Sequence, residues 1–404
     1  MKNRELLFHR MRSQGIAPAG FGNAEGVVGW MGCLQAQDFA AAKWAVGMRM
    51  GGGEPGAVTE AVVDAAFNEG RILRTHVLRP TWHFVLPADI GWMLRLTGSR
   101  VKTFCQPYHR QLGIDAAVLR RSKKIMVKAM EGGVSLMRQE LAVLFRQAKI
   151  DTSDIRMNYL LMDAELDGLI CSGPRKGKQF TYALLEERAP RQGSLRQDEY
   201  REDAALAELA RRYFASRGPA TVADLAWWGG MTLGQARRGL AIVGQELECV
   251  VIGDVEYWFG GGRMEAGVLG QMGVPVRERK GAGRTVQERA GVLGQTGAGR
   301  PGHAAAGKEV VLLPAFDEYT LAYKDRDAIV PAEYAKASFY GLKPVVLVRG
   351  RVAGMWKRTL DKGKVRVEVE AFGAWGQTVK RLVKKEAERF AAFAGDGKAS
   401  VVIS

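Results

Sequence analysis

The sequence predicts an α+β protein in which three tandem winged-helix units precede a smaller β-rich unit. One observation is a recurring order of helices followed by two short strands, which is typical of a winged helix. The other is the length of 404 residues, which exceeds what one compact core usually takes. The expected parts are winged helix 1 at 1–105, winged helix 2 at 106–195, winged helix 3 at 196–259, a mobile glycine-rich loop at 260–307, and a β-rich unit with a terminal helix at 308–404.

In the first unit, a helix precedes two strands. Residues 57–67 carry apolar side chains at helical spacing. Residues 72–85 are rich in β-branched and aromatic types on both sides of Arg79-Pro80, which predicts a strand, a turn and a second strand. Thr81 and His83 lie on the second of these strands.

In the second unit, Ser135 is a suitable N-cap for a helix that opens at that point. Residues 155–166 predict a second helix, and residues 168–182 predict a hairpin. The tip of this hairpin, GPRKGK, is strongly basic and suits a phosphate backbone. Its basic residues are Arg175, Lys176 and Lys178.

The third unit contains the clearest helix-turn-helix signal. Thr221 and Thr232 are good N-caps for two successive helices, with Gly229-Gly230 as the stop between them. Arg237 and Arg238 then lie near the start of a candidate recognition helix. The alternative is an architectural unit that only packs on its neighbours, which is common within a tandem array.

The last third of the chain changes character. Residues 260–307 are rich in glycine and cannot supply a packed core, so we expect a mobile loop. Apolar, β-branched runs then predict a small β-rich unit that ends in a basic helix. The expected strands are 310–313, 344–348, 351–355 and 365–369, and the expected helix is 377–392.

The charge distribution indicates a polyanionic partner. The net charge is +16, and residues 71–150 hold fifteen Lys or Arg residues against four acids, a net +11. A basic excess this concentrated favours nucleic acid over a solvated face. A membrane surface is the weaker option, because no basic amphipathic helix with aromatic anchors is evident.

Other classes of site find no support in the sequence. The four cysteines have no CxxC spacing and the five histidines no HxxxH pair, so we expect no metal site. A GxxxxGK[ST] loop is absent, so we expect no nucleotide cofactor, and no other cofactor is indicated. The N-terminus lacks the apolar core of a signal peptide, and no run is long enough to cross a bilayer, so we expect a cytoplasmic protein.

A short motif near the N-terminus, Gln35-Ala36-Gln37, is the candidate active site. Asp38 resembles an N-cap for the alanine-rich helix that begins at Phe39, which places both glutamines in the connector before it. Residues two apart on a helix point to nearly opposite sides. Both amides can therefore face one cleft only from a turn or an extended segment. Taken alone, such a motif is usually an ordinary turn.

Four motifs in order give the chain its resemblance to a known family. LQAQDFAAAKWAVGMRM, LRPTWHFVLPADI, LLPAFDEYTLAYKDR and VLVRGRVAGMWKR together resemble the AlkZ-like DNA glycosylase family over most of the chain. The resemblance implies tandem winged helices and a C-terminal β-barrel-like domain around a DNA channel. It also implies monofunctional hydrolysis of the N-glycosidic bond of purines alkylated at N7 or N3, with bulky adducts and interstrand crosslinks among the substrates. The family's Gln-x-Gln motif falls on Gln35 and Gln37.

Two further groups are weaker candidates for the site. His83, with Thr81, could hydrogen-bond a catalytic glutamine or a phosphate, although a structural role is more common for such a histidine. Asp317 and Glu318 could supply a general base. We favour ion pairs for these two acids, because charged residues follow closely at Lys324, Asp325 and Arg326.

We expect the partner to be double-stranded DNA carrying alkylated bases, bound by a monomer mostly through its phosphates. An alternative is a winged-helix transcriptional regulator without catalysis, and another is a family member that has kept the scaffold and lost or changed the reaction. Lesion excision without an operator preference separates an enzyme from a regulator. The expected DNA contacts are Arg74, Arg79, Arg175, Lys176, Lys178, Arg237 and Arg238.

Overall fold

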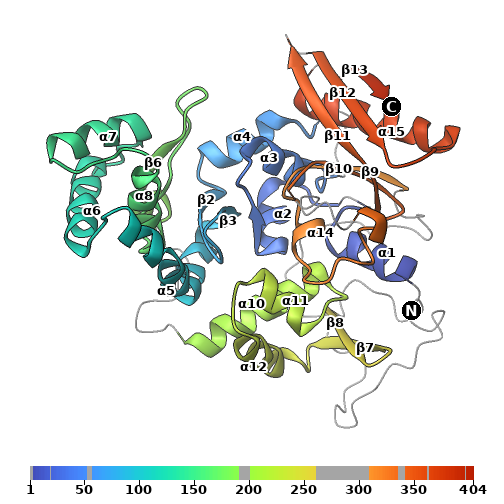
Figure 1. Ribbon diagram of the computed structural model, residues 1–404, viewed down its shortest axis with the longest axis horizontal. Coiled ribbons are helices and arrows are strands. Elements are labelled where there is room, and N and C mark those ends of the chain that lie inside the picture. Colours follow the sequence, from blue (N-terminus) through green and yellow to red (C-terminus); the bar gives the residue numbers. More distant parts are fainter. Residues whose placement is uncertain are drawn as a thin grey trace.

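The structure is a computed structural model, and in its described part four sheets, three antiparallel and one mixed, alternate with helices along the chain (Figure 1). The predicted glycine-rich loop lies outside the described residues, apart from Gly260 at its start. Within the described part of the chain, no helix combines the length and apolar character needed to cross a bilayer. The described residues are 3–18, 20–51, 57–190, 201–260, 309–334, 342–361, 364–395 and 397–404.

The first unit contains the predicted helix and both predicted strands. Its three-stranded sheet has the order β1-β3-β2, and β1 is a strand that we did not predict. All residues of these three strands are buried except Trp82, which is half-buried. The elements are α1 (Asn3–Ser13), α2 (Ala24–Met31), β1 (Cys33–Gln35), α3 (Phe39–Gly47), α4 (Glu60–Asn68), β2 (Leu73–His76) and β3 (Trp82–Val85).

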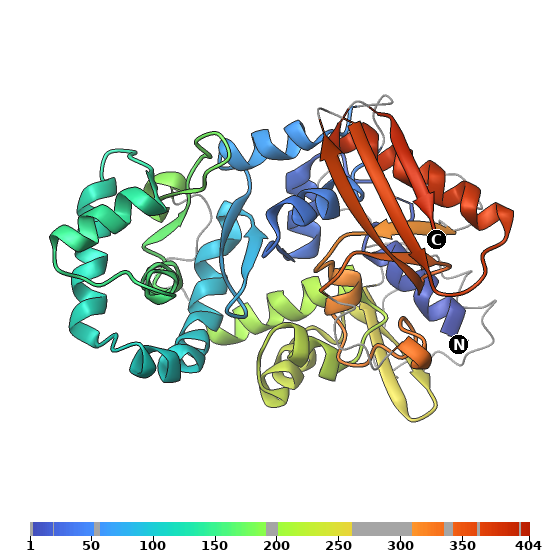
Figure 2. The same ribbon diagram turned by 45° about the horizontal axis from the view of Figure 1, so that its top comes forward.

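The second unit has a hydrophobic core of its own and lies to one side of the molecule (Figures 1 and 2). The predicted helix and hairpin are present. The prediction that Ser135 is the N-cap of a helix was wrong. Leu136 and Met137 pair with the hairpin as a short strand, so the helix begins only after Met137. The elements are α5 (Pro87–Gln111), α6 (Ala116–Met130), β4 (Leu136–Met137), α7 (Arg138–Gln147), α8 (Arg156–Leu166), β5 (Ile170–Ser172), β6 (Thr181–Leu184) and α9 (Leu185–Arg188).

The third unit packs against the first through a shared core. Both predicted N-caps are confirmed, since the hydroxyl groups of Thr221 and Thr232 accept hydrogen bonds from backbone N–H groups three residues later. The first of these helices ends at Trp228, before the predicted glycine stop. The elements are α10 (Glu202–Arg217), α11 (Val222–Trp228), α12 (Leu233–Val243), β7 (Leu247–Ile252) and β8 (Val255–Gly260).

The C-terminal unit is a five-stranded sheet in the order β13-β12-β11-β10-β9, with α15 packed against it (Figure 2). β13 and β9 are its two edges, so the described strands form an open sheet and do not close into the expected barrel. The predicted strands and helix are present, and the parallel strand β13 is an addition. The elements are β9 (Val310–Leu313), α14 (Glu318–Leu321), η1 (Ala332–Tyr334), β10 (Val345–Val348), β11 (Arg351–Asp361), β12 (Lys364–Ala371), α15 (Gln377–Ala394) and β13 (Ala399–Ile403).

The crossing of α10 and α12 generates a prediction about stability. A Cβ added at Gly239 would lie 2.7 Å from the backbone oxygen of Leu206, whereas at Gly234, on the same helix, the nearest atom is 3.9 Å away. Alanine raises helix propensity at both positions, so the contrast isolates the clash. We expect Gly239→Ala to be less stable than Gly234→Ala by about 1–3 kcal/mol. Thermal unfolding of the two variants measures this, and equal midpoints would contradict the close crossing.

Candidate active site

The two glutamines of the candidate motif lie at the end of β1, at the centre of the molecule. Gln35 is the last residue of the strand, is only 6% exposed, and pairs with His83 on β3. Gln37 follows in the exposed connector. Asp38 caps α3 by accepting a hydrogen bond from the N–H of Ala41, as predicted. Both glutamines therefore precede the helix, in a segment that changes from strand to connector.

The backbone fixes the orientation of both side-chain amides. The N–H of Gln37 donates to Oε1 of Gln35 at 2.8 Å, and the N–H of Trp82 donates to Oε1 of Gln37 at 3.3 Å. An N–H can only donate, so the amide atom that faces it must be the oxygen. Each oxygen keeps one further lone pair, and each NH₂ group stays free of these two bonds. The pair can thus offer both donors and acceptors to a small polar ligand.

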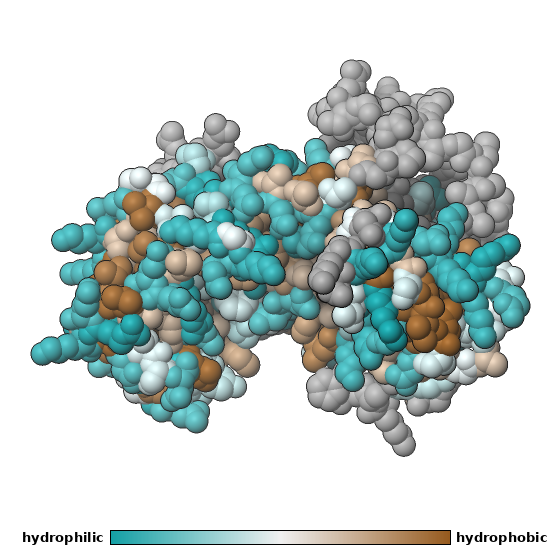
Figure 3. All heavy atoms as spheres, turned by 90° about the horizontal axis from the view of Figure 1, so that it is seen from above, coloured by the Kyte–Doolittle hydropathy of each residue, from teal (hydrophilic) through white to brown (hydrophobic). Residues whose placement is uncertain are grey.

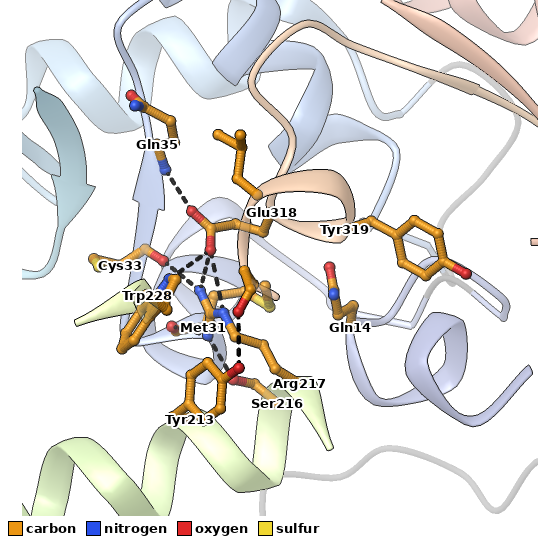
Figure 4. Close-up of polar contacts among 12 residues, drawn as sticks. Gln14, Met31, Cys33, Gln35, Tyr213, Ser216, Arg217, Trp228, Glu318 and Tyr319 are labelled. Atoms are coloured by element: carbon orange, nitrogen blue, oxygen red, sulfur yellow. Dashed lines mark hydrogen bonds and ion pairs between the residues drawn. The ribbon is translucent and has the colours of Figure 1, made fainter. Parts of the chain in front are cut away.

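The free edge of β1 is held by charged side chains in place of a neighbouring strand. Among the described strands, β1 pairs only with β3. On the other side, the N–H of Gln35 donates to Oε1 of Glu318 at 3.0 Å, and the carbonyl oxygen of Cys33 accepts from Nη2 of Arg217 at 3.0 Å (Figure 4). Unpaired backbone groups in a buried edge are costly. The two side chains satisfy one donor and one acceptor of this strand.

Glu318 and Arg217 are themselves an ion pair with no exposed side-chain surface. Nη2 of Arg217 lies 2.7 Å from Oε2 of Glu318, and Nε1 of Trp228 donates to the same oxygen at 2.7 Å (Figure 4). Burial alone would raise the pKa of Glu318, but the charge and hydrogen bonds of Arg217, with a further contribution from Arg79, lower it to about 2. Glu318 is therefore an anion, and both of its carboxylate oxygens are used in structural contacts.

The preference for ion pairs over a general base at Asp317 and Glu318 is confirmed. The prediction that these acids pair with charged residues close by in the sequence was wrong. Both side chains are buried in the core at the start of α14, where they meet arginines from distant parts of the chain. Asp317 pairs with Arg49, whose Nη1 lies 2.8 Å from Oδ2. Glu318 pairs with Arg217.

His83 lies beside Gln35 and is fully buried. Its Nδ1 is 2.9 Å from the carbonyl oxygen of Thr81, which can only accept, so Nδ1 carries the hydrogen. Nε2 is then a bare acceptor, and neither it nor Oγ1 of Thr81 has a hydrogen-bond partner among the described residues. Burial, followed by the nearby charge of Arg79, lowers the pKa of His83 to about 3. His83 is thus a neutral neighbour of the glutamine pair.

Two of the predicted DNA-binding arginines lie close to this site. Arg74 is buried between the rings of Trp82 and Phe180, 4.2 and 4.8 Å from their centroids, and its Nε donates to the carbonyl oxygen of Ala36. Burial lowers its pKa to about 10, which leaves it charged. Arg79 is half-buried in the turn between β2 and β3, and its Nε and Nη2 have no partner among the described residues.

The basic residues of the β5–β6 hairpin differ in exposure. Arg175 is 18% exposed and lies 3.7 Å from Asp64, with its guanidinium 5.2 Å from the centroid of the Phe39 ring. Lys176 is 47% exposed and lies 3.6 Å from Glu140. The side chain of Lys178 is exposed. The hairpin tip therefore presents its two lysines to solvent.

The two arginines of the candidate recognition helix also differ. Arg237 is exposed on α12 and forms no ion pair within the described chain. Arg238 is half exposed and pairs with Asp203 and, at 3.9 Å, with Glu202. Arg237 is therefore the freer cation.

No pattern in the sequence indicated Arg217 and Trp228 as residues of the site, which they join from the third unit. They lie far from the glutamine motif in the chain, and only the packing of the units brings them together. Among the described residues, no cluster of His, Cys, Asp and Glu side chains could hold a metal ion.

The buried, neutral His83 generates a prediction about stability and pH. Its pKa is about 3 in the folded chain, against a model-peptide value of 6.5, so the unfolded chain binds a proton that the folded chain excludes between these values. The stability of the protein should fall as the pH drops from about 6.5 towards 3, by up to about 1.4 kcal/mol per pH unit from this residue. In His83→Gln, the free energy of unfolding should fall less steeply. Urea unfolding at pH 6.5, 5.5 and 4.5 measures this, and parallel curves would refute it.

Comparison with known proteins assigns the chain to a family. A model of the DNA glycosylase AlkZ-like family matches residues 28–393. The chain is 23% identical over 413 residues to the "Interstrand DNA cross-link repair glycosylase" of Streptomyces sahachiroi, covering 99% of this chain and 98% of that protein. The solved structure of Streptomyces sahachiroi DNA glycosylase AlkZ matches with a TM-score of 0.74 and 21% identity over 99% of both chains, so the two share a fold. Since the family model spans most of its length, the chain belongs to the AlkZ-like DNA glycosylase family.

Proposed function

We propose that this protein is a monofunctional DNA glycosylase that hydrolyses the N-glycosidic bond of purines alkylated at N7 or N3 in double-stranded DNA. The observation that carries the proposal is the amide pair of Gln35 and Gln37, oriented by the backbone at the end of β1. Membership of the AlkZ-like family supports it, because the resemblance noted above implies that the family's Gln-x-Gln motif falls on these two residues. The relative named for interstrand crosslink repair supports bulky or crosslinked purines as substrates.

Hydrolysis of such a glycosidic bond needs little catalytic assistance from the protein. Alkylation at N7 or N3 makes the purine cationic, so the glycosidic bond is already weakened. The C1′–N bond breaks, its electron pair stays with the base, and the base leaves neutral. The oxygen of a water molecule bonds to C1′ of the oxocarbenium-like sugar, and a proton passes to solvent. The protein must stabilise the sugar cation and orient the water.

The amide pair can meet both demands. We assign Gln37, the exposed member, to orienting the water through the remaining lone pair of Oε1. Gln35 supports the water from the other side, or the sugar cation, with its amide dipole. His83 and Thr81 line the buried side of this arrangement, where the neutral imidazole adds an acceptor and no competing positive charge.

DNA binding follows from the three helix-and-strand units, which we propose act as winged helices around the site. Seen from above, hydrophilic residues dominate the surface, and an indentation lies between the second unit and the C-terminal unit (Figure 3). The first unit, which carries the glutamines, lies between them (Figure 1). An open approach of this kind suits bulky lesions. Phosphate contacts from Arg79, Lys176, Lys178 and Arg237 would hold the duplex, with little sequence readout by a monomer.

Replacing each glutamine tests the proposed chemistry. In Gln37→Ala and Gln35→Ala, we expect single-turnover release of base from N7-methylguanine DNA to slow by about 100-fold, because each removes one oriented polar group from the transition state. Strand scission after alkali reports the abasic product. The matched control is Gln139→Ala, which removes an exposed glutamine on α7 and should leave the rate unchanged. Unchanged rates in both site variants would end the proposal.

Salt dependence tests the DNA contacts. If about six phosphates are neutralised, the log–log slope of affinity against salt concentration should be roughly −5. Arg237→Ala should make the slope shallower by about 1, and Arg238→Ala by less, because Arg238 already pairs with acids. Fluorescence anisotropy with an undamaged duplex measures all three proteins. A nearly flat dependence in the wild type would contradict a phosphate-dominated interface.

A further inference from the structure

Two adjacent acids at the start of α14 form separate ion pairs in the core. Asp317 pairs with Arg49, and Glu318 pairs with Arg217, and none of these four side chains has exposed surface. The pairs differ in what they touch. Arg49 also donates to the carbonyl oxygens of Ala45 and Gln14, away from the active site. Glu318 touches β1.

A short series of hydrogen bonds leads from Glu318 to both catalytic candidates. Oε1 of Glu318 accepts from the N–H of Gln35 at 3.0 Å. Oε1 of Gln35 accepts from the N–H of Gln37 at 2.8 Å. The backbone position of Gln35 therefore sets where its own amide lies, and that amide in turn holds the backbone of Gln37.

We propose that Glu318 is a positioning residue of the glycosylase: its carboxylate fixes the open edge of β1 and thereby aims both amides, without touching the substrate. The catalytic part of this inference rests on the function proposed above. A carboxylate suits the position because it only accepts. Oε1 faces one backbone donor, and Oε2 faces the donors of Arg217 and Trp228.

Glu318→Gln should reverse the contact with β1 while keeping the size of the side chain. Three N–H donors, two from Arg217 and one from Trp228, converge on Oε2, so the single amide oxygen will occupy that place. The NH₂ group must then face the N–H of Gln35, and two donors oppose each other. Asp317→Asn is the matched control, because it weakens an equally buried ion pair on the next residue but makes no contact with β1 in the described structure.

The experiment compares full-length wild type, Glu318→Gln and Asp317→Asn. We expect both variants to unfold at lower temperature. Per folded molecule, Glu318→Gln should release N7-methylguanine at least about tenfold more slowly at saturating DNA, with DNA affinity within about twofold of wild type, whereas Asp317→Asn should stay within about threefold of the wild-type rate. Equal rate losses in the two variants would overturn the inference.

Hydrogen exchange supplies a readout that does not depend on catalysis. The amide hydrogens of Gln35 and Gln37 should exchange about tenfold faster in Glu318→Gln than in wild type and should be unaffected in Asp317→Asn. Wild-type exchange in Glu318→Gln would overturn the inference even if the protein proved not to release bases. An inactive wild type with the expected exchange would instead refute only the proposed function.

A second pair of variants covers the case in which Glu318→Gln does not fold. Arg217→Lys keeps the positive charge but has one nitrogen in place of the fork that reaches Cys33 and Met31. Arg49→Lys is its matched control. The same difference in excision rate and in amide exchange is expected, and its absence counts against the positioning role.

Discussion

The buried ion pair between Arg217 and Glu318 is the interaction on which the geometry of the site depends. Removing two charges from water is costly, and the cost is offset only where nearly every donor and acceptor is used. Here Glu318 accepts from four protein donors, and Arg217 also donates to the backbone oxygens of Met31 and Cys33. The pair brings together the first, third and C-terminal units at one short strand. Because these contacts hold the strand in place, two flexible glutamine side chains can have defined directions.

The chemistry and the electrostatics of the site agree. Glu318, whose carboxylate accepts from the N–H of Gln35, holds its charge against Arg217, and the nearest histidine is kept neutral. In the function that we propose, what remains to face a substrate is a pair of neutral amides. Such a site is weak as an acid or base, which matches the proposed substrate, whose leaving group already carries a positive charge.

Much of the fold could be predicted from local patterns, because caps, turns and β-branched runs act over a few residues. Thr221 and Thr232 begin helices as expected, and Val310–Leu313 is a strand with the predicted bounds. Ser135 failed as a cap because pairing with a strand more than forty residues away overrode a local preference. β1 was missed because three residues are too few to show an alternating pattern. The open sheet shows that strand propensity does not determine whether a sheet closes.

Some features of the site could likewise be predicted from the sequence, and others could not. The glutamine motif, the cap at Asp38 and the neighbourhood of His83 follow from the sequence, because they lie on adjacent elements of one unit. The ion partners of Asp317 and Glu318 do not, because any of many arginines could reach a buried acid until the packing is known. Arg74 illustrates the same limit, since only the structure shows it enclosed by Trp82 and Phe180.

In the mechanism that we propose, two neutral amides suffice because the alkylated base is already a cation. The most direct measurement compares single-turnover excision from duplexes that differ only in one base, N7-methylguanine in one and the uncharged lesion hypoxanthine in the other. We expect release of N7-methylguanine and no measurable release of hypoxanthine on the same timescale. Comparable rates for the two bases would show that the protein supplies an acid or a stronger stabilising charge, and would contradict the claim.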